Sequence, residues 1–461
     1  MTFSRSLPQS LTGGTDTIVA LGTVPGRSAL AVIRLSGDRA IEIAGRHISP
    51  WPLGSHQARL CTVHEKGRTL DHSIVTVFIA PRSFSGEDMV EISTHGGHVV
   101  PAAVMTALIS SGAREALPGE FTRRAVLNGK LDVVQAEAIG DLVDAQSSAM
   151  HQTALNQLDG GLSSRIALLR ESILSLESLI AYDVDFPEED DGPVSQSRII
   201  ESIDNLLSTL DLLLSTIPVG QIVKDGAIVV IAGEPNVGKS SLFNALLGEK
   251  RAIVTEIPGT TRDAIEGLID AGQWPMRLID TAGLRDSQDV VERLGIETSE
   301  RYISHAHLIL ACGDSEASLA RTVTAIAGMS SVPLISVLTK SDMNGHIPET
   351  QTVSSDALHV SAVTGEGLSS LQSVMESAIS RVYGEISPEL PVLTRARHIQ
   401  ALEYARSEIS GFRTAWLTGT LPSTVAAVHL RSACVSLESL IGAVSTDDVL
   451  ERVFSAFCVG K

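Results

Sequence analysis

Apolar residues recur at helical spacing through the middle and the end of the chain. One run advances by four and three residues in turn and consists of Leu162, Ile166, Leu169, Ile173, Leu176 and Ile180. Further runs are Ile199, Ile203, Leu206, Leu210 and Leu213; Ala405, Ile409, Phe412 and Trp416; and Leu430, Leu437, Leu440 and Val444. Such spacing predicts helices that bury one face. The same period also permits packing between two chains.

The N-terminal part has a different pattern. Short segments rich in β-branched and apolar residues alternate there with glycine and proline, which predicts strands. The segments are Thr17–Val24, Ala29–Leu35, Ser73–Ile79 and Met89–Ser93, and a helix is expected over Val99–Ser110. We therefore expect an α+β domain over residues 1–129.

Residues 224–385 alternate strand and helix patterns, which predicts a mainly parallel sheet. The helical pattern lies on both sides of this segment. The simplest interpretation is one all-α domain, formed by residues 130–223 and 386–461, with the α/β domain of residues 224–385 inserted into it. We therefore expect a multidomain α/β protein, and 461 residues fit about three domains.

The charge balance narrows the choice of partners. The chain has 35 basic and 54 acidic residues, for a net charge of −19. Such a chain binds phosphate backbones poorly unless a local patch or a partner protein overcomes the repulsion. The acidic segment 183–191 is best explained as a solvated connector, with a metal site as the alternative.

Composition also bears on the compartment. The four cysteines have no metal-ligand spacing, which suits a reducing compartment; they are Cys61, Cys312, Cys434 and Cys458. No apolar run approaches the roughly 20 residues of a membrane span. The first residues lack the pattern of a secretory signal. We expect a cytoplasmic protein without a membrane partner.

A phosphate-binding loop is predicted at Gly233–Ser240, which has the pattern GxxxxGKS. It lies between an expected strand, Ala227–Ala232, and an expected helix, Ser241–Leu247, which is the context that such a loop requires. Backbone N–H groups and the helix N-terminus would hold phosphate oxygens. Lys239 is expected to reach the β- and γ-phosphates, and the Ser240 hydroxyl to bind Mg²⁺.

Two further segments belong to the phosphate side of this site. The sequence Asp-Thr-Ala-Gly at Asp280–Gly283 follows an expected strand, Arg277–Ile279, and a carboxylate there can hold Mg²⁺ through water. Upstream, the segment Gly259–Asp263 supplies the switch threonines Thr260 and Thr261. Thr261 is expected to be the second Mg²⁺ ligand and to be ordered when the γ-phosphate is present.

Base recognition is predicted at Thr339–Asp342, which follows the expected strand Leu334–Leu338. The carboxylate of Asp342 can accept both N–H donors of guanine, a pair that adenine lacks. The usual motif begins with asparagine, so Thr339 loses an amide and a weaker nucleotide affinity is expected. Ser361 and Ala362 resemble the final base-contacting segment. Together these residues predict a GTPase.

One expected catalytic group is absent from its usual place. Leu284 stands where many GTPases have a glutamine that orients the attacking water. Leucine cannot orient water, so another group must do so. A second positive charge must likewise replace an arginine finger.

The chain resembles, essentially end to end, the family of tRNA-modification GTPases named MnmE or TrmE. The resemblance is carried by Asp16–Ala20, Pro25–Arg27, Ile33–Gly37, Ser85–Asp88, His95–Gly97, Gly119–Phe121, Leu127–Asp132, Gln135–Ala138, Asp185–Glu189, the nucleotide-site segments and Phe457–Lys461. A phosphate-binding loop alone indicates only a superfamily. A GTPase domain inserted in helices, together with a C-terminal Cys-x-Gly-Lys motif, is specific.

The resemblance implies a K⁺-activated GTPase whose GTPase domains dimerise on GTP binding. K⁺ would replace the arginine finger, and its implied ligands are the Asn236 side chain, the carbonyls of Thr255 and Ile257, and Thr260. Glu292 matches the family's water-orienting glutamate, and Lys239 is the other expected catalytic residue. The expected GTP-binding residues are Asn236, Val237, Gly238, Lys239, Ser240, Ser241, Thr255, Glu256, Ile257, Pro258, Gly259, Thr260, Thr261, Asp280, Thr281, Ala282, Gly283, Thr339, Lys340, Asp342, Ser361 and Ala362.

The N-terminal domain resembles the family's folate-binding and dimerisation domain, which takes a 5-formyl-tetrahydrofolate-type ligand. Arg34, Glu87, Lys130 and Lys461 fall on its folate-site positions. The Glu87 carboxylate can pair with donors of the pterin ring, while arginine and lysine suit carbonyls and the glutamate tail. By the same resemblance Cys458 lies near the modification site, but a cysteine there is more often a small packing residue.

The implied function is modification of C5 of the wobble uridine (U34) of certain tRNAs to a (carboxymethyl)aminomethyl derivative, with the one-carbon unit from folate. The implied partners are a second copy of the chain, tRNA and an MnmG-type FAD protein, in a heterotetramer or larger complex. One alternative is a regulatory or ribosome-assembly GTPase switch, against which the folate-type motifs argue. Another is a folate-binding scaffold with a vestigial nucleotide site, against which Lys239, Ser240, Asp280 and Asp342 argue.

Overall fold

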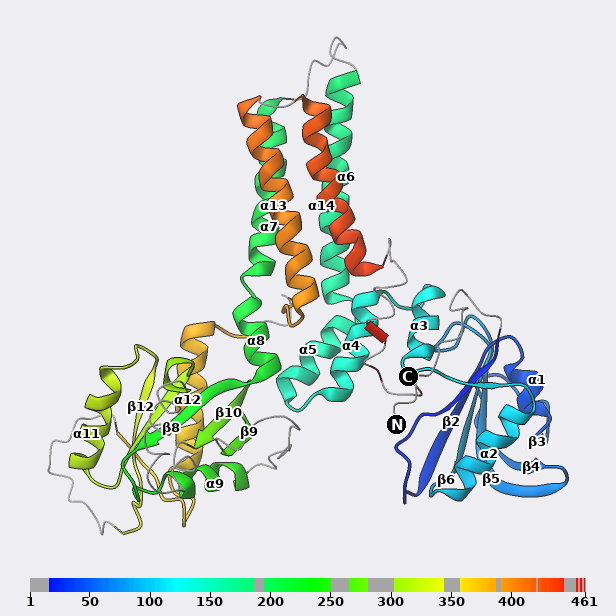
Figure 1. The fold of residues 1–461 in the computed structure, drawn as a ribbon, viewed down its shortest axis with the longest axis horizontal. Coiled ribbons are helices and arrows are strands. Elements are labelled where there is room, and N and C mark those ends of the chain that lie inside the picture. Colours follow the sequence, from blue (N-terminus) through cyan, green and yellow to red (C-terminus); the bar gives the residue numbers. More distant parts are fainter. Residues whose placement is uncertain are drawn as a thin grey trace, which may run out of the picture. The chain divides into compact units, whose positions relative to one another are not determined.

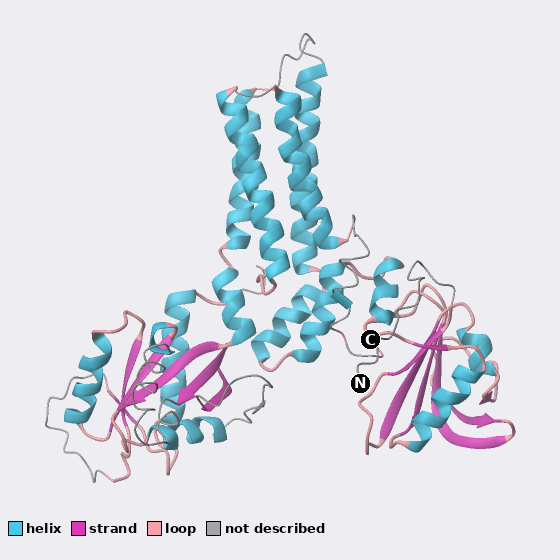
Figure 2. Cartoon of the chain, viewed as in Figure 1, coloured by secondary structure: helices cyan, strands magenta, loops and turns pink. Residues whose placement is uncertain are grey.

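The structure is a computed structural model of the chain. It describes residues 16–185, 195–249, 265–280, 302–343, 357–386, 391–419, 422–442, 453, 454, 457 and 460 (Figures 1 and 2). Two compact units are present, one formed by residues 1–140 with 438–461 and the other by residues 141–437. The domain limits expected from the sequence, at 129, 223 and 385, stay predictions.

The first unit contains a seven-stranded sheet in the order β3-β4-β5-β6-β2-β1-β7. Its strands are β1 (Ile18–Leu21), β2 (Leu30–Ser36), β3 (Ile48–Ser49), β4 (Arg59–Glu65), β5 (Arg68–Phe78), β6 (Met89–His95) and β7 (Arg114–Glu115). Neighbouring strands are antiparallel except β1 and β7, which are parallel. The core lies between one face of this sheet and helices α1 (Ala40–Gly45) and α2 (Val99–Ser110), because Ile33 and Ile92 of the sheet cluster with Ile43 and Leu108 of the helices.

Two helices and the C-terminal segment complete this unit. α3 (Glu120–Leu127) follows β7, and α4 (Val133–Asp144) continues out of the unit. Phe454, near the end of the chain, is buried against Val133 and Ala136 of α4. Gly119, just before α3, has φ +66°, and a Cβ there would lie 2.8 Å from the Phe454 carbonyl oxygen. Phe454 and Phe457 therefore lie close to the start of α3.

The second unit contains the long helices. They are α5 (Ser148–Leu158), α6 (Gly161–Asp185), α7 (Gln196–Leu214), α8 (Ile217–Asp225), α13 (Ala396–Thr418) and α14 (Ser423–Ile441). Every apolar position of the two first periodic runs is at most 3% exposed, so the helices and buried faces predicted there are confirmed. α7 packs against α6 and α13. Trp416 is only half-buried, its neighbour Ala415 facing the core instead, and Val444 lies outside the described residues.

Among the described residues, the stretch Gln196–Asp225 has the length and apolar composition of a membrane span. A single helix of this kind is weak support for a membrane protein, because core helices of soluble proteins meet the same criteria. Here the apolar face of α7 is used within the bundle, where Ile199, Leu206 and Leu213 are buried.

A six-stranded sheet forms the rest of the second unit, in the order β13-β12-β11-β8-β10-β9. Its strands are β8 (Ala227–Gly233), β9 (Ile265–Ala271), β10 (Trp274–Asp280), β11 (Leu308–Gly313), β12 (Leu334–Leu338) and β13 (Leu358–His359), and α9 (Lys239–Glu249), α11 (Glu316–Ala327) and α12 (Leu368–Tyr383) accompany them. Only β9 and β10 pair antiparallel, so the mainly parallel sheet is confirmed. The strand order reverses at β8, which has β10 on one side and β11 on the other; ligands bind such sheets at this kind of switch point.

The sequence missed some elements. The four strands predicted in the N-terminal part are present, with ends shifted by up to five residues, as in β5, which begins at Arg68 instead of Ser73. β4 and β9 were not expected. Both lie at or near a sheet edge, where polar residues interrupt the apolar pattern, as with Glu266 and Asp270 in β9.

Candidate functional site

The candidate nucleotide site lies at the carboxyl edge of the six-stranded sheet. In the strand registers Cys312 pairs with Gly233, Gly313 with Leu338, and Asp280 with Ile231. The last residues of β8, β10, β11 and β12 therefore reach the same edge. Each of the three predicted motifs begins directly after, or at, one of these strand ends.

The loop after β8 has the backbone that the motif requires. Gly238 has φ +96° and Asn236 has φ +63°, so both are left-handed, and Val237 between them is buried. Turns of this kind form concave sites for anions from successive N–H groups. A Cβ on Gly233 would lie 2.5 Å from the carbonyl oxygen of Cys312, so only glycine fits there. Burial raises the pKa of the Cys312 thiol to about 12, which fits a packing role for this cysteine.

The predicted phosphate and Mg²⁺ residues occupy different environments. The Lys239 side chain is buried, and its Nζ donates to the Glu234 carbonyl oxygen at 2.8 Å across the loop. Ser240 and Ser241 are exposed in the first turn of α9. Asp280 is 1% exposed at the end of β10. A hydroxyl and a carboxylate are oxygen donors of the kind that Mg²⁺ prefers.

The Glu234 side chain ties this loop to α11. It accepts from Arg321 Nε at 2.7 Å and from the Ser318 hydroxyl at 2.9 Å. These hydrogen bonds, first that from Arg321, lower the pKa of Glu234 to about 2. This contact could not be predicted from sequence, because a glutamate inside the loop motif and an arginine 87 residues later have no common pattern.

The base-recognition segment is bonded directly to the phosphate-binding loop. The Thr339 hydroxyl lies against the carbonyl oxygens of Val237 and, at 3.1 Å, Gly313. The single hydroxyl proton serves one carbonyl at a time, and the Val237 oxygen is the nearer acceptor. Lys340 has φ +57°, and its Nζ donates to the Asn236 carbonyl oxygen at 2.7 Å. Thr339 thus supplies a donor to the loop in spite of the missing amide.

Asp342 is oriented by the final predicted segment. The Ser361 hydroxyl is fully buried and donates to Asp342 Oδ1 at 2.7 Å. Ser361 Oγ in turn accepts from the Thr364 N–H at 3.1 Å. Because Oδ1 has a fixed donor, the carboxylate is held in one orientation, as a two-point contact with guanine requires. Ala362 is half-buried beside it.

Several predicted residues lie outside the described residues. They are Thr255, Glu256, Ile257, Pro258, Gly259, Thr260, Thr261, Thr281, Ala282, Gly283, Leu284, Glu292, Cys458 and Lys461. Most of the acidic segment 183–191 also lies outside them. In the described part of the chain, no group of three or more His, Cys, Asp or Glu side chains is placed to hold a metal ion.

In the first unit, two of the predicted folate residues, Arg34 and Lys130, contact backbone carbonyls of other segments. Arg34 Nε donates to Glu91 Oε1 at 2.9 Å, and its Nη1 reaches the carbonyl oxygen of Gly460 at 3.4 Å. Gly460, the residue before Lys461, therefore lies next to Arg34. Lys130 Nζ donates to the Pro81 carbonyl oxygen at 3.0 Å, at the start of the loop that carries Glu87.

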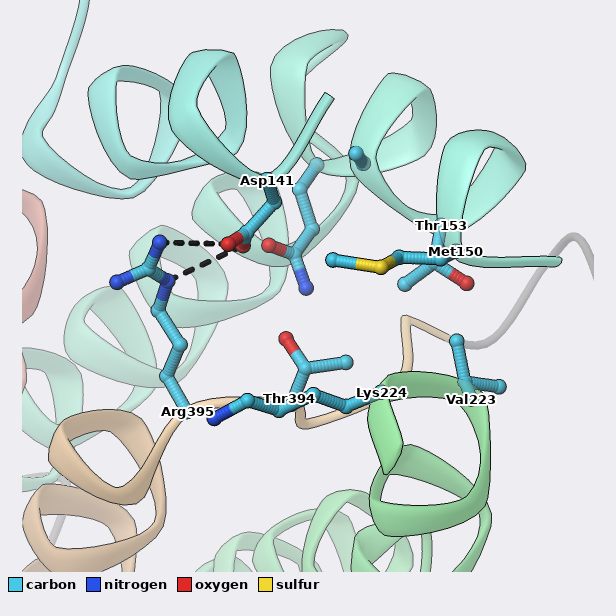
Figure 3. A pocket seen from close by; sticks show the side chains of 9 residues that line it. Asp141, Met150, Thr153, Val223, Lys224, Thr394 and Arg395 are labelled. Atoms are coloured by element: carbon cyan, nitrogen blue, oxygen red, sulfur yellow. Dashed lines mark hydrogen bonds and ion pairs between the residues drawn. The ribbon is translucent and has the colours of Figure 1, made fainter. Parts of the chain in front are cut away.

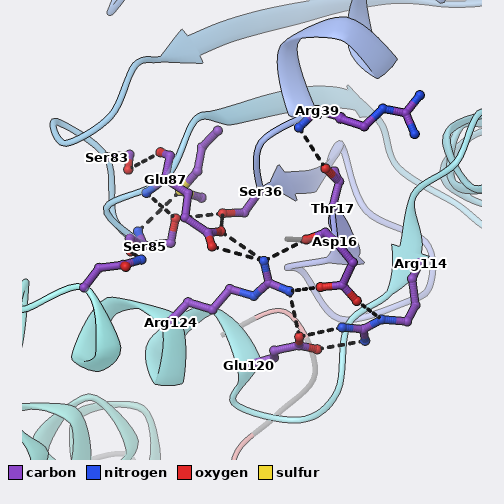
Figure 4. A network of polar contacts seen from close by, with 12 residues as sticks. Asp16, Thr17, Ser36, Arg39, Ser83, Ser85, Glu87, Arg114, Glu120 and Arg124 are labelled. Carbon is purple, nitrogen blue, oxygen red and sulfur yellow. Dashed lines mark hydrogen bonds and ion pairs between the residues drawn. The ribbon is translucent and has the colours of Figure 1, made fainter. Parts of the chain in front are cut away.

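Glu87 belongs to a polar network that the sequence did not reveal (Figure 4). Its carboxylate accepts from the Ser36 hydroxyl at 2.7 Å and from Arg124 Nη1 at 3.1 and 3.2 Å. Arg124 also bonds Asp16 and Glu120. A possible signal was Glu120 four residues before Arg124, a spacing that places the two side chains on one helix face.

A cavity of about 160 Å³ lies in the second unit, beside α8 and the segment before α13 (Figure 3). On its wall Arg395 donates to Asp141 at 2.6 and 3.1 Å. Gln157, also on the wall, donates through Nε2 to the Val392 carbonyl oxygen at 3.1 Å, while its buried Oε1 has no hydrogen-bond partner among the described residues. No residue predicted for nucleotide or folate binding lines this cavity.

Two family models match the chain. The model for the "GTP-binding protein TrmE N-terminus" matches residues 17–130, and the model for the "MnmE helical domain" matches residues 133–458. The second match spans more than half of the chain and includes the inserted sheet.

Full-length relatives are also similar. The tRNA modification GTPase MnmE of Caldicellulosiruptor saccharolyticus is 36% identical over 457 residues, covering 97% of this chain and 99% of that protein. MnmE of Aquifex aeolicus is 36% identical over 451 residues, covering 97% and 100%. Among solved structures, the G domain of the T. maritima FeoB iron transporter is 29% identical and covers 34% of this chain and 99% of that one, with a TM-score of 0.26.

Proposed function

The chain belongs to the MnmE family of tRNA-modification GTPases, and on this premise we propose that it hydrolyses GTP to drive modification of the wobble uridine of certain tRNAs. The observation that supports the GTPase role most is the meeting of Lys239, Asp280 and Asp342 at one sheet edge. Asp342 there has an orienting hydrogen bond from Ser361, which favours guanine over adenine.

In this proposal, each residue of the edge has a separate task. Lys239 contacts the β- and γ-phosphates, because its buried ammonium lies across the loop that would enclose them. Ser240 and Thr261 hold Mg²⁺, which supplies charge neutralisation on the phosphates when bound. Asp342 accepts the two N–H donors of guanine. Glu292 orients the attacking water, the task for which Leu284 is unsuited.

We further propose K⁺ activation on GTP-dependent pairing of the GTPase domains. Asn236, Thr255, Ile257 and Thr260 would hold the ion beside the phosphates. Asn236 suits this task because it is exposed and left-handed, while its own carbonyl oxygen is engaged by Lys340. A cation at this place would offset the charge that develops on the phosphate oxygens, which is the work of an arginine finger.

The first unit is proposed to bind a reduced folate of the 5-formyl-tetrahydrofolate type and to pair with a second copy. Arg34, Glu87, Lys130 and Lys461 would contact it. The approach of Gly460 to Arg34 supports this grouping, because it brings the C-terminal segment to one of the four positions. The ligand would supply the one-carbon unit for C5 of the uridine.

An MnmG-type FAD protein and tRNA complete the proposed assembly, in the cytoplasm. A partner that carries much of the tRNA surface is consistent with the net charge of −19. The test of the whole proposal is the content of modified wobble uridine in tRNA from cells that lack this protein. Purified protein should in addition hydrolyse GTP, with K⁺ required for the full rate.

A further inference from the structure

Arg124 lies at the centre of the polar network in the first unit (Figure 4). Its Nη1 donates to both carboxylate oxygens of Glu87, at 3.1 and 3.2 Å, and to the Asp16 carbonyl oxygen at 2.9 Å. Its Nη2 donates to Asp16 Oδ1 at 2.7 Å and to Glu120 Oε1 at 3.0 Å. One guanidinium thus joins the segment before β1, α3 and the loop before β6.

The Arg124 side chain is buried, whereas Glu87 is partly open. Arg124 is 8% exposed, and the Glu87 side chain 20%. An ionised carboxylate can accept about four hydrogen bonds. Glu87 accepts one hydrogen bond from Ser36 and two from Arg124 Nη1, so capacity for about one more remains for a ligand.

The loop that carries Glu87 is also held by a residue next to α3, the helix that carries Arg124. Asn128, one residue beyond α3, donates from Nδ2 to the Ser85 carbonyl oxygen at 2.8 Å. Gly86 has φ +80°, and a Cβ there would lie 2.9 Å from the Asn128 Cβ. The Ser85 hydroxyl lies 2.7 Å from that of Ser36, which donates to Glu87. Asn128 thus holds the backbone before Glu87, and Arg124 holds the Glu87 carboxylate.

The charges of the network favour a ligand that brings N–H donors. Three carboxylates, those of Asp16, Glu87 and Glu120, contact two guanidinium groups, those of Arg114 and Arg124. With all five ionised, one negative charge is in excess. Asp16 and Glu120 each contact both guanidinium groups, whereas Glu87 contacts only that of Arg124, so the negative charge of Glu87 is the least compensated of the three.

We propose that Arg124 is a positioning residue for the ligand site of the first unit: its guanidinium holds the Glu87 carboxylate aimed at an N–H donor of the pterin ring. This role rests on the proposed folate binding, because it assigns Arg124 a task in that same site. Arg124 does not contact the ligand. It acts through the orientation of Glu87.

Arg114 provides a matched control. It bonds Asp16 at 2.7 Å and Glu120 at 2.7 and 3.0 Å, two carboxylates that Arg124 also bonds. Its other partner is the Glu115 carbonyl oxygen. Substitution of Arg114 therefore weakens the same network without removing a partner of Glu87.

The experiment is a titration of the full-length protein with 5-formyl-tetrahydrofolate, by calorimetry. We expect Arg124→Gln to weaken binding roughly tenfold or more, since a charged hydrogen-bond partner of Glu87 is lost, and Arg114→Gln to change it less than about threefold. Arg124→Lys, which retains the charge without the planar fork, should fall between them. Amide hydrogen exchange within the first unit of each variant reports that this unit is folded.

A double-mutant cycle separates positioning from general loss of stability. If Arg124 acts through Glu87, then Glu87→Gln combined with Arg124→Gln should bind no more weakly than Glu87→Gln alone. Additive losses, or equal losses in Arg114→Gln and Arg124→Gln, would overturn the positioning role while leaving folate binding intact. Absence of saturable binding by the unaltered protein would overturn folate binding itself and this role with it. If Arg124→Gln does not fold, Arg124→Lys is compared with Arg114→Gln and with Glu87→Gln in its place.

Discussion

The hydroxyl of Thr339 donates to the backbone carbonyl of Val237, and thereby joins the base-recognition segment to the phosphate-binding loop. Thr339 is 4% exposed, so the carbonyl has no ready replacement from solvent. The sequence alone indicated a loss at this position, because threonine lacks the amide of the usual asparagine. The geometry instead indicates that one hydroxyl proton is sufficient for the contact to Val237.

Removal of this hydroxyl should therefore weaken nucleotide binding. Thr339→Val leaves a buried carbonyl without its donor, which costs about 1–3 kcal/mol and corresponds to a roughly 5- to 150-fold faster release of nucleotide. Thr339→Ser keeps the hydroxyl and should release nucleotide at nearly the original rate. Release of a fluorescent GDP analogue in stopped flow measures both. Equal rates for the valine and serine variants would show that the bond is not needed.

Base specificity should depend on the carboxylate of Asp342. Asn in its place offers one donor for the C2 carbonyl of xanthine and one acceptor for its N1–H, and so matches xanthine better than the two donors of guanine. Asp342→Asn is therefore expected to lose GTP hydrolysis and gain XTP hydrolysis. A variant that still preferred GTP tenfold or more would argue against Asp342 as the base contact.

Ser361 should support the contact between Asp342 and guanine by orienting the carboxylate. Ser361→Ala removes the hydroxyl that donates to Asp342 at 2.7 Å, so the carboxylate loses its orientation. We expect a loss of about 1 kcal/mol in GTP affinity with the preference for guanine retained. Competition between GTP and ATP for the purified variant measures both quantities, and an unchanged affinity would assign Ser361 to packing alone.

Hydrolysis should depend on the monovalent cation. K⁺ is expected to stimulate the rate over Na⁺ at equal ionic strength, and Asn236→Ala should remove this difference because it deletes a proposed ligand of the ion. Glu292→Ala should retain GTP binding and lose turnover. Phosphate release in KCl and in NaCl tests the cation assignment, which equal rates of the unaltered protein would refute.

Acid should destabilise the first unit through Glu120. Burial would raise the pKa of Glu120, but donors led by Arg114 outweigh it and hold this pKa below the ordinary 4.5. A carboxylate with a lowered pKa stabilises the fold above pH 4.5, and this contribution is lost as the pH falls through the lowered value. The protection factors of amides in β1 and α3, which are corrected for the intrinsic exchange rate, should therefore fall as the pH drops below about 4.5. Arg114→Gln should make this fall smaller, because the folded-state pKa of Glu120 then lies closer to the unfolded value, and an unchanged profile would contradict the assignment to Glu120.

The sequence predicted best those features that depend on local pattern. The periodic runs in α6 and α7 identified every position of these helices that is described as buried, because a helix in a bundle buries the same face at each turn. The phosphate-binding loop was likewise readable, since its glycine positions and lysine are fixed by local geometry. The strand β9, which pairs antiparallel with β10, could not be predicted, because its polar residues at a sheet edge interrupt the alternation of apolar and polar positions.

Contacts between distant segments could not be predicted in this way. Arg124 bonds Asp16, 108 residues earlier, and Glu87, 37 residues earlier. Charges on three separate segments have no common period, so only folding shows that they meet. For the same reason the contact from Thr339 to Val237, 102 residues apart, was not foreseen.

The most direct test of the account is the wobble uridine itself. Nucleosides of total tRNA from a strain without this protein are compared by mass spectrometry with those from the same strain carrying the protein or its Lys239→Ala variant. We expect the (carboxymethyl)aminomethyl uridine to disappear without the protein, to return with the unaltered chain, and not to return with Lys239→Ala. Unchanged modification in the strain without the protein would contradict the account and favour a regulatory or ribosome-assembly GTPase.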